Sequence, residues 1–144
     1  MMTPASFAER LGGTRVLRTT IRSELDLARA VHEGIPTAAI DEVLASGLLD
    51  AAELYALVIP RRTLTHRRER RQPLGRDESD RLTRVVRVLA RAEEALGDPA
   101  RAAHWMRAPN RALRGERPLD LLSSDVGART VERVLGRIEH GVYS

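Results

Sequence analysis

A strongly cationic segment holds the clearest candidates for chemistry in this sequence. Residues 61–76, RRTLTHRRERRQPLGR, carry seven arginines and one glutamate. Arginine binds phosphates and forms bidentate hydrogen bonds with the edge of guanine, and threonine contacts polar base edges or the methyl group of thymine. These residue types in so short a segment favour contact with DNA. The candidate DNA-binding residues are Arg61, Arg62, Thr63, Thr65, His66, Arg67, Arg68, Arg70 and Arg71.

A short helix and a tight turn are predicted to position this segment. In DAAELYALV, residues 50–58, Asp50 is placed to cap a helix. Ile59-Pro60 then ends that helix, because proline disfavours helical geometry in the residue before it and readily opens a new helix. A basic helix over 61–71, with Leu64 as its core contact, completes the order of a helix-turn-helix. In that motif the first residues of the second helix reach base edges, and the later arginines are better placed for phosphates.

An alternative interpretation of the same arginines is a solvated helix end or a linker. The distribution of charge favours the DNA-binding interpretation. Residues 1–60 have a net charge of −3 and residues 77–144 one of +1, whereas residues 61–76 have one of +6. The positive potential is therefore concentrated in the predicted basic helix and the residues that follow it. Recognition of a palindromic site would also require a dimer.

Helical patterns occur on both sides of this motif and no strand pattern does, so the predicted fold is all-α, with an N-terminal helix-turn-helix bundle and a small helical domain after it. Residues 1–22 contain Pro4 and Gly12-Gly13 but no sustained apolar period, which predicts a flexible N-terminal arm with at most a short helical turn. Beyond the helix-turn-helix, helices are expected over 23–34, 37–46, 77–96, 99–107 and 125–141.

The apolar spacing within these helices predicts which side chains are buried. In the first of them the residues near helical spacing are Leu25, Ala28, Val31 and Ile35. The segment 77–96 has the clearest amphipathic pattern, with a stripe that runs from Leu82 to Leu96, and Asp77 is expected to cap its N-terminus.

The composition argues against several classes of protein. Aromatic residues make up only 3% of the chain, too few for the stacking platforms of single-strand-binding proteins. There is no cysteine, and the four histidines lie far apart without ligand spacing, so no metal site, cofactor or catalytic activity is predicted. No apolar run has the length of a signal peptide or of a membrane span, which predicts a cytoplasmic protein without a membrane partner.

A second pattern with functional character is HWMRAPNRALRGERPLDLL, residues 104–122. Pro109 and Pro118 fix the backbone around a loop, and Gly115 permits tight geometry. The single tryptophan of the chain lies beside a methionine, and side chains of this kind supply the apolar area that dominates protein interfaces. The segment is therefore predicted to form a docking surface for a protein partner.

The segment from Glu94 to Ser144 resembles the C-terminal toxin-binding domain of the Xre/MbcA/ParS antitoxin family. The matching elements, in order, are a Gly-Asp before a helix that ends in Trp-Met, a Pro-Asn, an Ala-Leu followed by Gly, a Pro-Leu-Asp-Leu-Leu, a Gly before the last helix and a terminal Gly-Val-Tyr. An ordered match of this length is more specific than any single motif. Residues 34–82, from GIPTAAID to ESDRL, look like the Xre-like helix-turn-helix domain of the same family.

This resemblance implies a type II antitoxin, which binds and blocks a toxin, usually a RES-domain enzyme that consumes NAD, and represses its own operon. The chain then divides into a flexible arm over 1–22, a helix-turn-helix domain over 23–93 and a helical toxin-binding domain over 94–144. A homodimer and a hetero-oligomer with the toxin are the expected assemblies. The toxin contacts that the matched motifs imply are Trp105, Met106, Pro109, Asn110, Leu113, Gly115, Pro118, Leu119, Leu122, Gly141, Val142 and Tyr143.

Two alternatives remain open at this point. Burial preferences favour a core position over a partner contact for Trp105, Leu119 and Leu122, taken residue by residue. The other alternative is a stand-alone helix-turn-helix repressor whose C-terminal domain only mediates dimerisation. Such a repressor would share every DNA-binding feature, so the two functions are separated by the match over 94–144 and by whether a RES-type gene lies next to this one.

Overall fold

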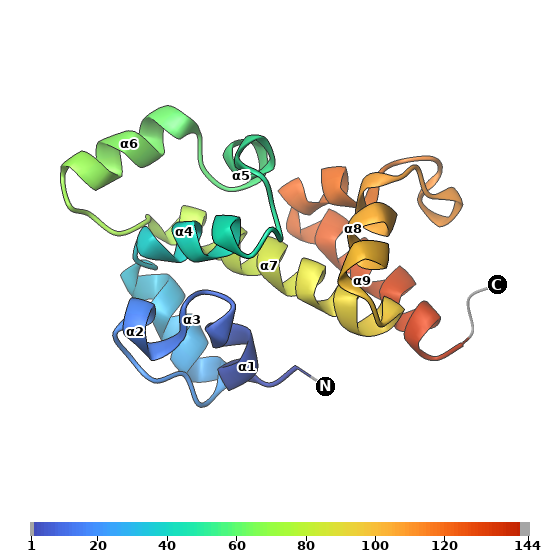
Figure 1. Cartoon of the computed structure of the whole chain (residues 1–144), viewed down its shortest axis with the longest axis horizontal. Helices are drawn as coiled ribbons and strands as arrows, with labels where there is room; N and C mark the ends of the chain where they lie inside the picture. The colour runs from blue at the N-terminus through green and yellow to red at the C-terminus, as the bar shows by residue number, and fades with distance from the viewer. Residues whose placement is uncertain (1, 142–144) are drawn as a thin grey trace. The chain divides into compact units, whose positions relative to one another are not determined.

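The computed structural model describes residues 2–141, which form α-helices and 3-10 helices and contain no strand (Figure 1). The predicted all-α fold is confirmed. In chain order the elements are α1 (Pro4–Glu9), α2 (Gly13–Leu17), α3 (Glu24–Glu33), α4 (Ala38–Ala45), α5 (Ala51–Leu57), α6 (Arg61–Glu69), α7 (Arg76–Leu96), α8 (Pro99–Arg107), η1 (Arg111–Leu113), η2 (Pro118–Ser123) and α9 (Asp125–Glu139).

The chain divides into two compact units. The first extends from Met2 to Thr83 and the second from Arg84 onward, so the division falls within the 21-residue helix α7. The predicted domain boundary between residues 93 and 94 stays a prediction. Within the described range, no helix has both the length and the apolar character that a membrane span requires.

The N-terminal segment differs from the flexible arm that its sequence predicts, because it forms α1 and α2. The hydroxyl of Thr3 accepts a hydrogen bond from the Ser6 N–H at 3.0 Å, which caps α1. Gly12, in the turn between the two helices, and Gly13, the first residue of α2, have φ values of 102° and 62°. Each helix is shorter than two turns, so no apolar period could be recognised in the sequence. The side chains that this segment buries are Phe7, Ala8, Leu11, Val16, Leu17 and Ile21.

The buried side chains of α3 differ from those that the sequence predicts. Leu25 is 62% exposed, whereas Leu27 is buried. The half-buried Ala30 and Val31 lie on the same helical face as Leu27, and Leu25 lies roughly on the opposite face from Leu27. Ile35 is fully buried but lies beyond the end of α3, after the C-cap Gly34. Ala28 is exposed as well, so the expected core positions of Leu25 and Ala28 were wrong.

Helix α7 contains the predicted apolar stripe, with Leu82, Val85, Val86, Leu89 and Ala92 buried. Its N-terminus differs from the prediction, because the helix already begins at Arg76 and Asp77 lies within the first turn. The capping contact comes instead from Glu78, whose carboxylate accepts a hydrogen bond from the Gly75 N–H at 2.7 Å.

The second unit is built around η2, which packs against both α8 and α9. Asp98 caps α8 through the Arg101 N–H at 2.8 Å, and Ser124 caps α9 through the Gly127 N–H at 3.0 Å. Gly127 lies so close to η2 that an added Cβ would collide with the carbonyl oxygen of Leu121. The first turn of α9 therefore requires glycine at this position.

Replacement of Gly127 with alanine is expected to lower the free energy of unfolding by about 1–3 kcal/mol, because the methyl group would push α9 away from η2. Gly136→Ala is the matched control on the same helix. Among the described residues, an added Cβ there meets only the end of the flexible Arg91 side chain, so this variant should gain about 0.5–1 kcal/mol from helix propensity. Urea denaturation of both variants measures the difference, and equal stability would contradict the close packing of α9 on η2.

Candidate functional site

The helix-turn-helix begins with α5, whose N-terminus has the predicted cap. The Asp50 carboxylate accepts the Glu53 N–H at 2.8 Å, and the Glu53 carboxylate accepts the Asp50 N–H at 3.0 Å. This reciprocal capping box starts the helix sharply. Leu54 and Leu57 are buried, so α5 is held against the core of the first unit.

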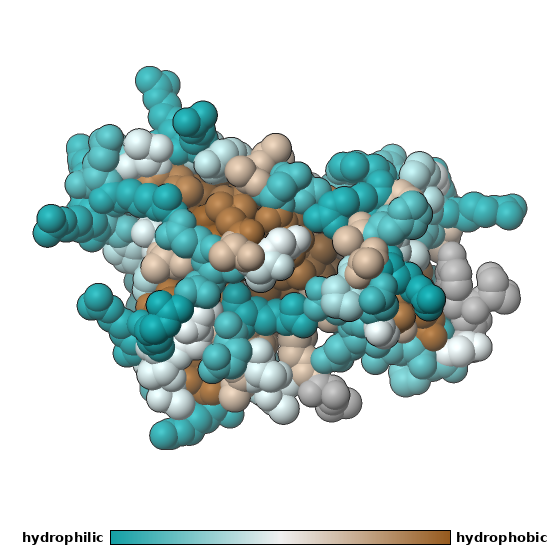
Figure 2. Space-filling view, viewed as in Figure 1, coloured by the Kyte–Doolittle hydropathy of each residue, from teal (hydrophilic) through white to brown (hydrophobic). Residues whose placement is uncertain are grey.

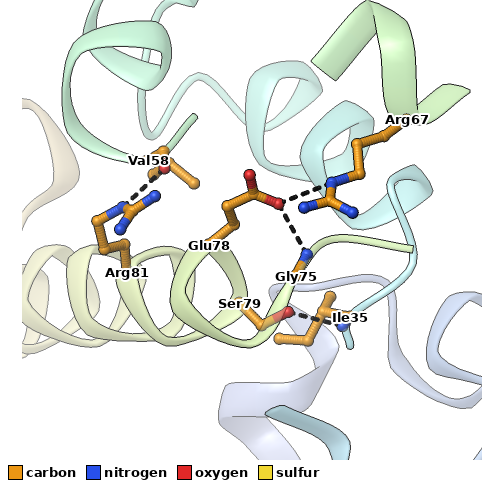
Figure 3. A network of polar contacts seen from close by, with 7 residues as sticks. All are labelled: Ile35, Val58, Arg67, Gly75, Glu78, Ser79 and Arg81. Atoms are coloured by element: carbon orange, nitrogen blue, oxygen red, sulfur yellow. Dashed lines mark hydrogen bonds and ion pairs between the residues drawn. The ribbon is translucent and has the colours of Figure 1, made fainter. Parts of the chain in front are cut away.

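The turn between α5 and α6 is held by apolar burial and by one arginine. Val58 and Ile59 are buried, and Pro60 directly precedes α6. The Nε of Arg81 donates a hydrogen bond to the Val58 carbonyl at 2.9 Å, which joins the turn to α7 (Figure 3). Leu64 is 4% exposed and is the buried anchor of α6, as predicted.

Glu78 connects the end of α6 to the start of α7. Its carboxylate accepts hydrogen bonds from Arg67 Nε at 3.1 Å and from the Gly75 N–H at 2.7 Å, and the residue is buried (Figure 3). Beside it, the buried Ser79 hydroxyl accepts the Ile35 N–H at 2.8 Å. The Ile35 carbonyl in turn accepts the Leu74 N–H at 2.9 Å. Arg67 is thus an internal brace of this network.

Helix α6 ends two residues before the predicted residue 71. The Arg71 N–H donates to the Arg68 carbonyl at 3.1 Å, and the Gln72 N–H donates to the Arg67 carbonyl at 2.9 Å. These two bonds form a Schellman-type end, which places Arg71 in the left-handed region with φ 53°. Glycine is the usual residue at such a position.

The outer face of α6 presents most of the predicted DNA-binding residues to solvent. Long hydrophilic side chains stand out at the α6 end of the first unit (Figure 2). Arg61, Arg62, Thr65 and His66 line one hollow together. Within residues 2–141, the guanidinium groups of Arg61 and Arg62 have no ion-pair partner, whereas Arg68 pairs with Asp41 at 2.8 Å. The exposed candidates are Arg61, Arg62, Thr65, His66, Arg68, Arg70 and Arg71, and the half-buried ones are Thr63 and Arg67.

In the second unit, Asn110 organises the loop that the sequence singles out. Its side-chain oxygen accepts the Ala112 N–H at 2.9 Å, and its backbone carbonyl accepts the Gly115 N–H at 2.8 Å. Its own N–H donates to the Glu116 carbonyl at 3.1 Å. These bonds close a compact loop around η1, in which Arg114 and Gly115 have positive φ. The buried Asn110 therefore shapes the loop from within.

A salt bridge fixes the start of η2. Arg117 donates to both carboxylate oxygens of Asp120, at 2.9 and 2.8 Å. These hydrogen bonds hold the pKa of Asp120 below its ordinary value of 3.8, although partial desolvation opposes the shift. Because this pKa is lowered in the folded chain, the stabilisation is present at neutral pH and is lost as the pH falls below the ordinary value.

The predicted toxin contacts separate into shaping and exposed residues. Trp105 is half-buried, as is typical of a side chain at the edge of a core. The exposed candidates are Pro109, Gly115 and Gly141. The buried candidates are Met106, Asn110, Leu113, Pro118, Leu119 and Leu122. Val142 and Tyr143 lie outside the described residues.

The structure also reveals a surface that sequence reasoning missed. Arg129, Arg133 and Arg137 line a hollow along the outer side of α9, together with Arg91 from α7. At the start of the same helix Val126 lines this hollow and is 65% exposed. The four-residue spacing of the three arginines was the signal that could have indicated this face. No group of three or more metal-ligating side chains is assembled within residues 2–141.

Two models of known protein domains match this chain. The model of the antitoxin Xre-like helix-turn-helix domain matches residues 26–87, which include α5, the turn and α6. The model of the antitoxin Xre/MbcA/ParS C-terminal toxin-binding domain matches residues 91–141. An antitoxin Xre from Pseudomonas putida is 32% identical over 121 residues, which cover 84% of this chain and 76% of the relative.

The chain belongs to the Xre antitoxin family. A second antitoxin Xre, from Yersinia enterocolitica, is 36% identical over 120 residues, 82% of this chain and 81% of the relative. A protein from Sphingobium named "Prs ADP-ribosylating antitoxin" is 24% identical over 132 residues, which cover 85% and 83% of the two chains. The family resemblance that the sequence motifs carry is thereby confirmed.

This Xre-family antitoxin therefore contains a helix-turn-helix domain and a toxin-binding domain in one chain. Residues 2–25, which include α1 and α2, precede the region that the helix-turn-helix model matches. The outer hollow of α9 lies within the range of the toxin-binding model.

The contrast between Arg67 and Arg61 leads to a stability prediction. Arg67→Ala should lower the free energy of unfolding by about 1–3 kcal/mol, because it leaves the buried Glu78 carboxylate with one charged hydrogen bond fewer. Arg61→Ala, on the exposed start of the same helix, is the control and should leave stability unchanged within about 0.5 kcal/mol. Chemical denaturation checks both values, and an unchanged Arg67→Ala variant would remove Arg67 from the bracing network.

Proposed function

We propose that this chain is the antitoxin of a type II toxin–antitoxin pair, which neutralises a RES-type toxin that consumes NAD and represses its own operon by binding promoter DNA. The observation that carries the proposal is that matches to the family's helix-turn-helix and toxin-binding domains occur in one chain. In this proposal the chain acts by binding and catalyses no reaction.

For the DNA-binding half, the exposed face of α6 supports major-groove recognition. Arg61, Arg62 and Thr65 occupy the N-terminal part of α6, which reaches base edges in this docking mode. Arg68, Arg70 and Arg71 follow at its C-terminal end and serve as phosphate contacts. Arg67 contributes by positioning α6 through Glu78. A palindromic operator would be bound by two copies of the chain, one for each half-site.

For the toxin-binding half, the exposed surface of the second unit provides the contacts. The proposed contact surface includes Pro109, Gly115 and the exposed part of Trp105. Val126 adds an exposed apolar side chain at the start of α9. The buried candidates, from Met106 to Leu122, act by shaping this surface. Gly141, Val142 and Tyr143 remain proposed contacts at the end of the chain.

The chemistry of the toxin is proposed from the family resemblance and from one relative. The name of the Sphingobium relative links an antitoxin of this kind with ADP-ribosylation. ADP-ribosyl transfer consumes NAD, which agrees with a RES-type toxin as the partner. A stand-alone repressor is the less supported alternative, because it gives no role to the toxin-binding match over residues 91–141.

From the proposed DNA-binding function we expect Arg61→Ala and Arg62→Ala each to reduce operator affinity about tenfold or more. Each substitution removes a bidentate contact with a base, which is worth about 1–3 kcal/mol. A variant with Arg111→Ala and Arg114→Ala, two exposed arginines of the second unit, is the control for loss of positive charge. Fluorescence anisotropy with the chain's own promoter fragment measures the affinities. Unchanged affinity of the Arg61 and Arg62 variants at physiological salt would remove the recognition-helix assignment.

The toxin-binding half predicts that Val126→Asp weakens the complex with the toxin, because it places a charge on an apolar contact. Leu25→Asp is a closely matched control. Both residues are highly exposed and occupy the second position of a helix whose N-cap is serine, where aspartate suits the helix dipole. Co-expression with the neighbouring gene product, affinity purification and a growth assay provide the measurement.

The outcomes of that experiment are distinct. Growth rescue and a stable complex with the wild-type chain and with Leu25→Asp, but weaker capture by Val126→Asp, would support the proposed contact. Equal capture by both variants would place the toxin elsewhere on the second unit. No complex and no rescue with the wild-type chain, while operator binding is intact, would favour the stand-alone repressor.

A further inference from the structure

A basic hollow of about 540 Å³ lies in the first unit, between α2, the start of α4 and the end of α6. Arg15 and Arg18 line it from the N-terminal segment, and Arg68 and Arg71 line it from the end of α6. Residues 36–38 at the start of α4 form another wall. Among residues 2–141, no acidic side chain lines the hollow, so the charged side chains of its described lining are all arginines.

Two of the four arginines are held in place by carboxylates of α4. Arg15 forms an ion pair with Glu42, and Arg68 forms one with Asp41 at 2.8 Å. The remaining two, Arg18 and Arg71, are exposed and have no ion-pair partner among residues 2–141. The hollow therefore combines two oriented guanidinium groups with two that are available to an anionic ligand.

The position of the hollow relative to α6 indicates which anion binds in the hollow. Helix α6 has nine residues, and at about 1.5 Å per residue it is about 13 Å long. In the docking mode proposed for α6, its first residues face the bases and its later arginines face phosphates, so its C-terminal end lies toward the phosphate backbone. Arg68 and Arg71 belong to this end, so the hollow continues the proposed DNA-binding face.

We propose that this hollow is a binding site for the phosphate backbone of DNA, with Arg18 and Arg71 as direct phosphate contacts, Arg68 as a further contact whose guanidinium is oriented by Asp41, and Arg15 as an oriented side wall. The proposal rests on the proposed DNA-binding function and extends it to α2, which lies before the matched helix-turn-helix region 26–87. The N-terminal segment is then part of the DNA-binding surface.

The backbone at Arg18 allows a test that separates contact from folding. Arg18 and Arg114 both lie in the left-handed region, with φ 59° and 56°, and each follows the last residue of a short helix. Glycine adopts this conformation without the penalty that a side chain imposes. Arg18→Gly therefore removes the guanidinium without loss of fold. Arg114→Gly makes the same change in charge and backbone at a residue of the second unit that is not part of the hollow's lining, and is the matched control.

The affinity of the full chain for its promoter fragment and for unrelated duplex DNA is measured over a range of salt concentrations. For Arg18→Gly, we expect affinity to fall by a similar factor for both sequences, because phosphates carry no sequence information. The slope of log affinity against log salt should decrease by about 0.9, the value for one lost phosphate contact. Arg114→Gly should match the wild-type chain, and Arg18→Gly/Arg71→Gly should lower the slope about twice as much.

The possible failures are distinguishable. If the wild-type chain binds no promoter DNA, the proposed DNA-binding function fails. If the wild-type chain binds but Arg18→Gly and Arg114→Gly have the same affinity and salt slope, the function stands and the hollow is no phosphate site. Loss of thermal stabilisation by inorganic phosphate in Arg18→Gly, without loss of DNA affinity, would assign the hollow to a free anion and overturn the proposal.

Discussion

The buried carboxylate of Glu78 determines where the basic helix α6 lies. It binds Arg67 from α6 and the Gly75 N–H before α7, while the adjacent Ser79 binds the backbone at Ile35 (Figure 3). A buried carboxylate is stable only when its hydrogen bonds are satisfied, so the ends of α6 and α7 are joined at one point. The exposed arginines of α6 are useful for recognition because this contact, together with buried Leu64, fixes the helix that carries them.

Arginine has three distinct roles in this chain, and contacts alone distinguish them. Arg67 and Arg81 act inside the first unit, where they bind Glu78 and the Val58 carbonyl. Arg15 and Arg68 are oriented by carboxylates on α4. Arg61 and Arg62 have no ion-pair partner within the described residues and are available to a ligand. Since all of these carry the same charge, a charge count over 61–76 could locate the basic surface but could not separate brace from contact.

The second unit shows the same separation between residues that shape a surface and residues that form it. Asn110 is buried and closes the loop around η1, while Pro109 and Gly115 lie exposed on it. Because Gly127 has no side chain, α9 can pack closely against the backbone of η2. This packing fixes the helix that carries the exposed Val126. Several motif residues of the toxin-binding domain therefore stabilise the shape of the surface and do not form it. This explains why several of the matched apolar positions are buried.

The sequence by itself determined the all-α class, most helix positions, the cap at Asp50, the burial of Leu64 and the family, because these depend on local propensities and on ordered motifs. Only the tertiary structure decided that residues 4–17 form helices and that Leu25 is exposed. It also decided the bracing contact of Arg67 and the basic hollow lined by both Arg18 and Arg71. These features arise from contacts between residues far apart in the chain. A helix shorter than two turns shows no period, and a salt bridge across eleven residues leaves no local pattern.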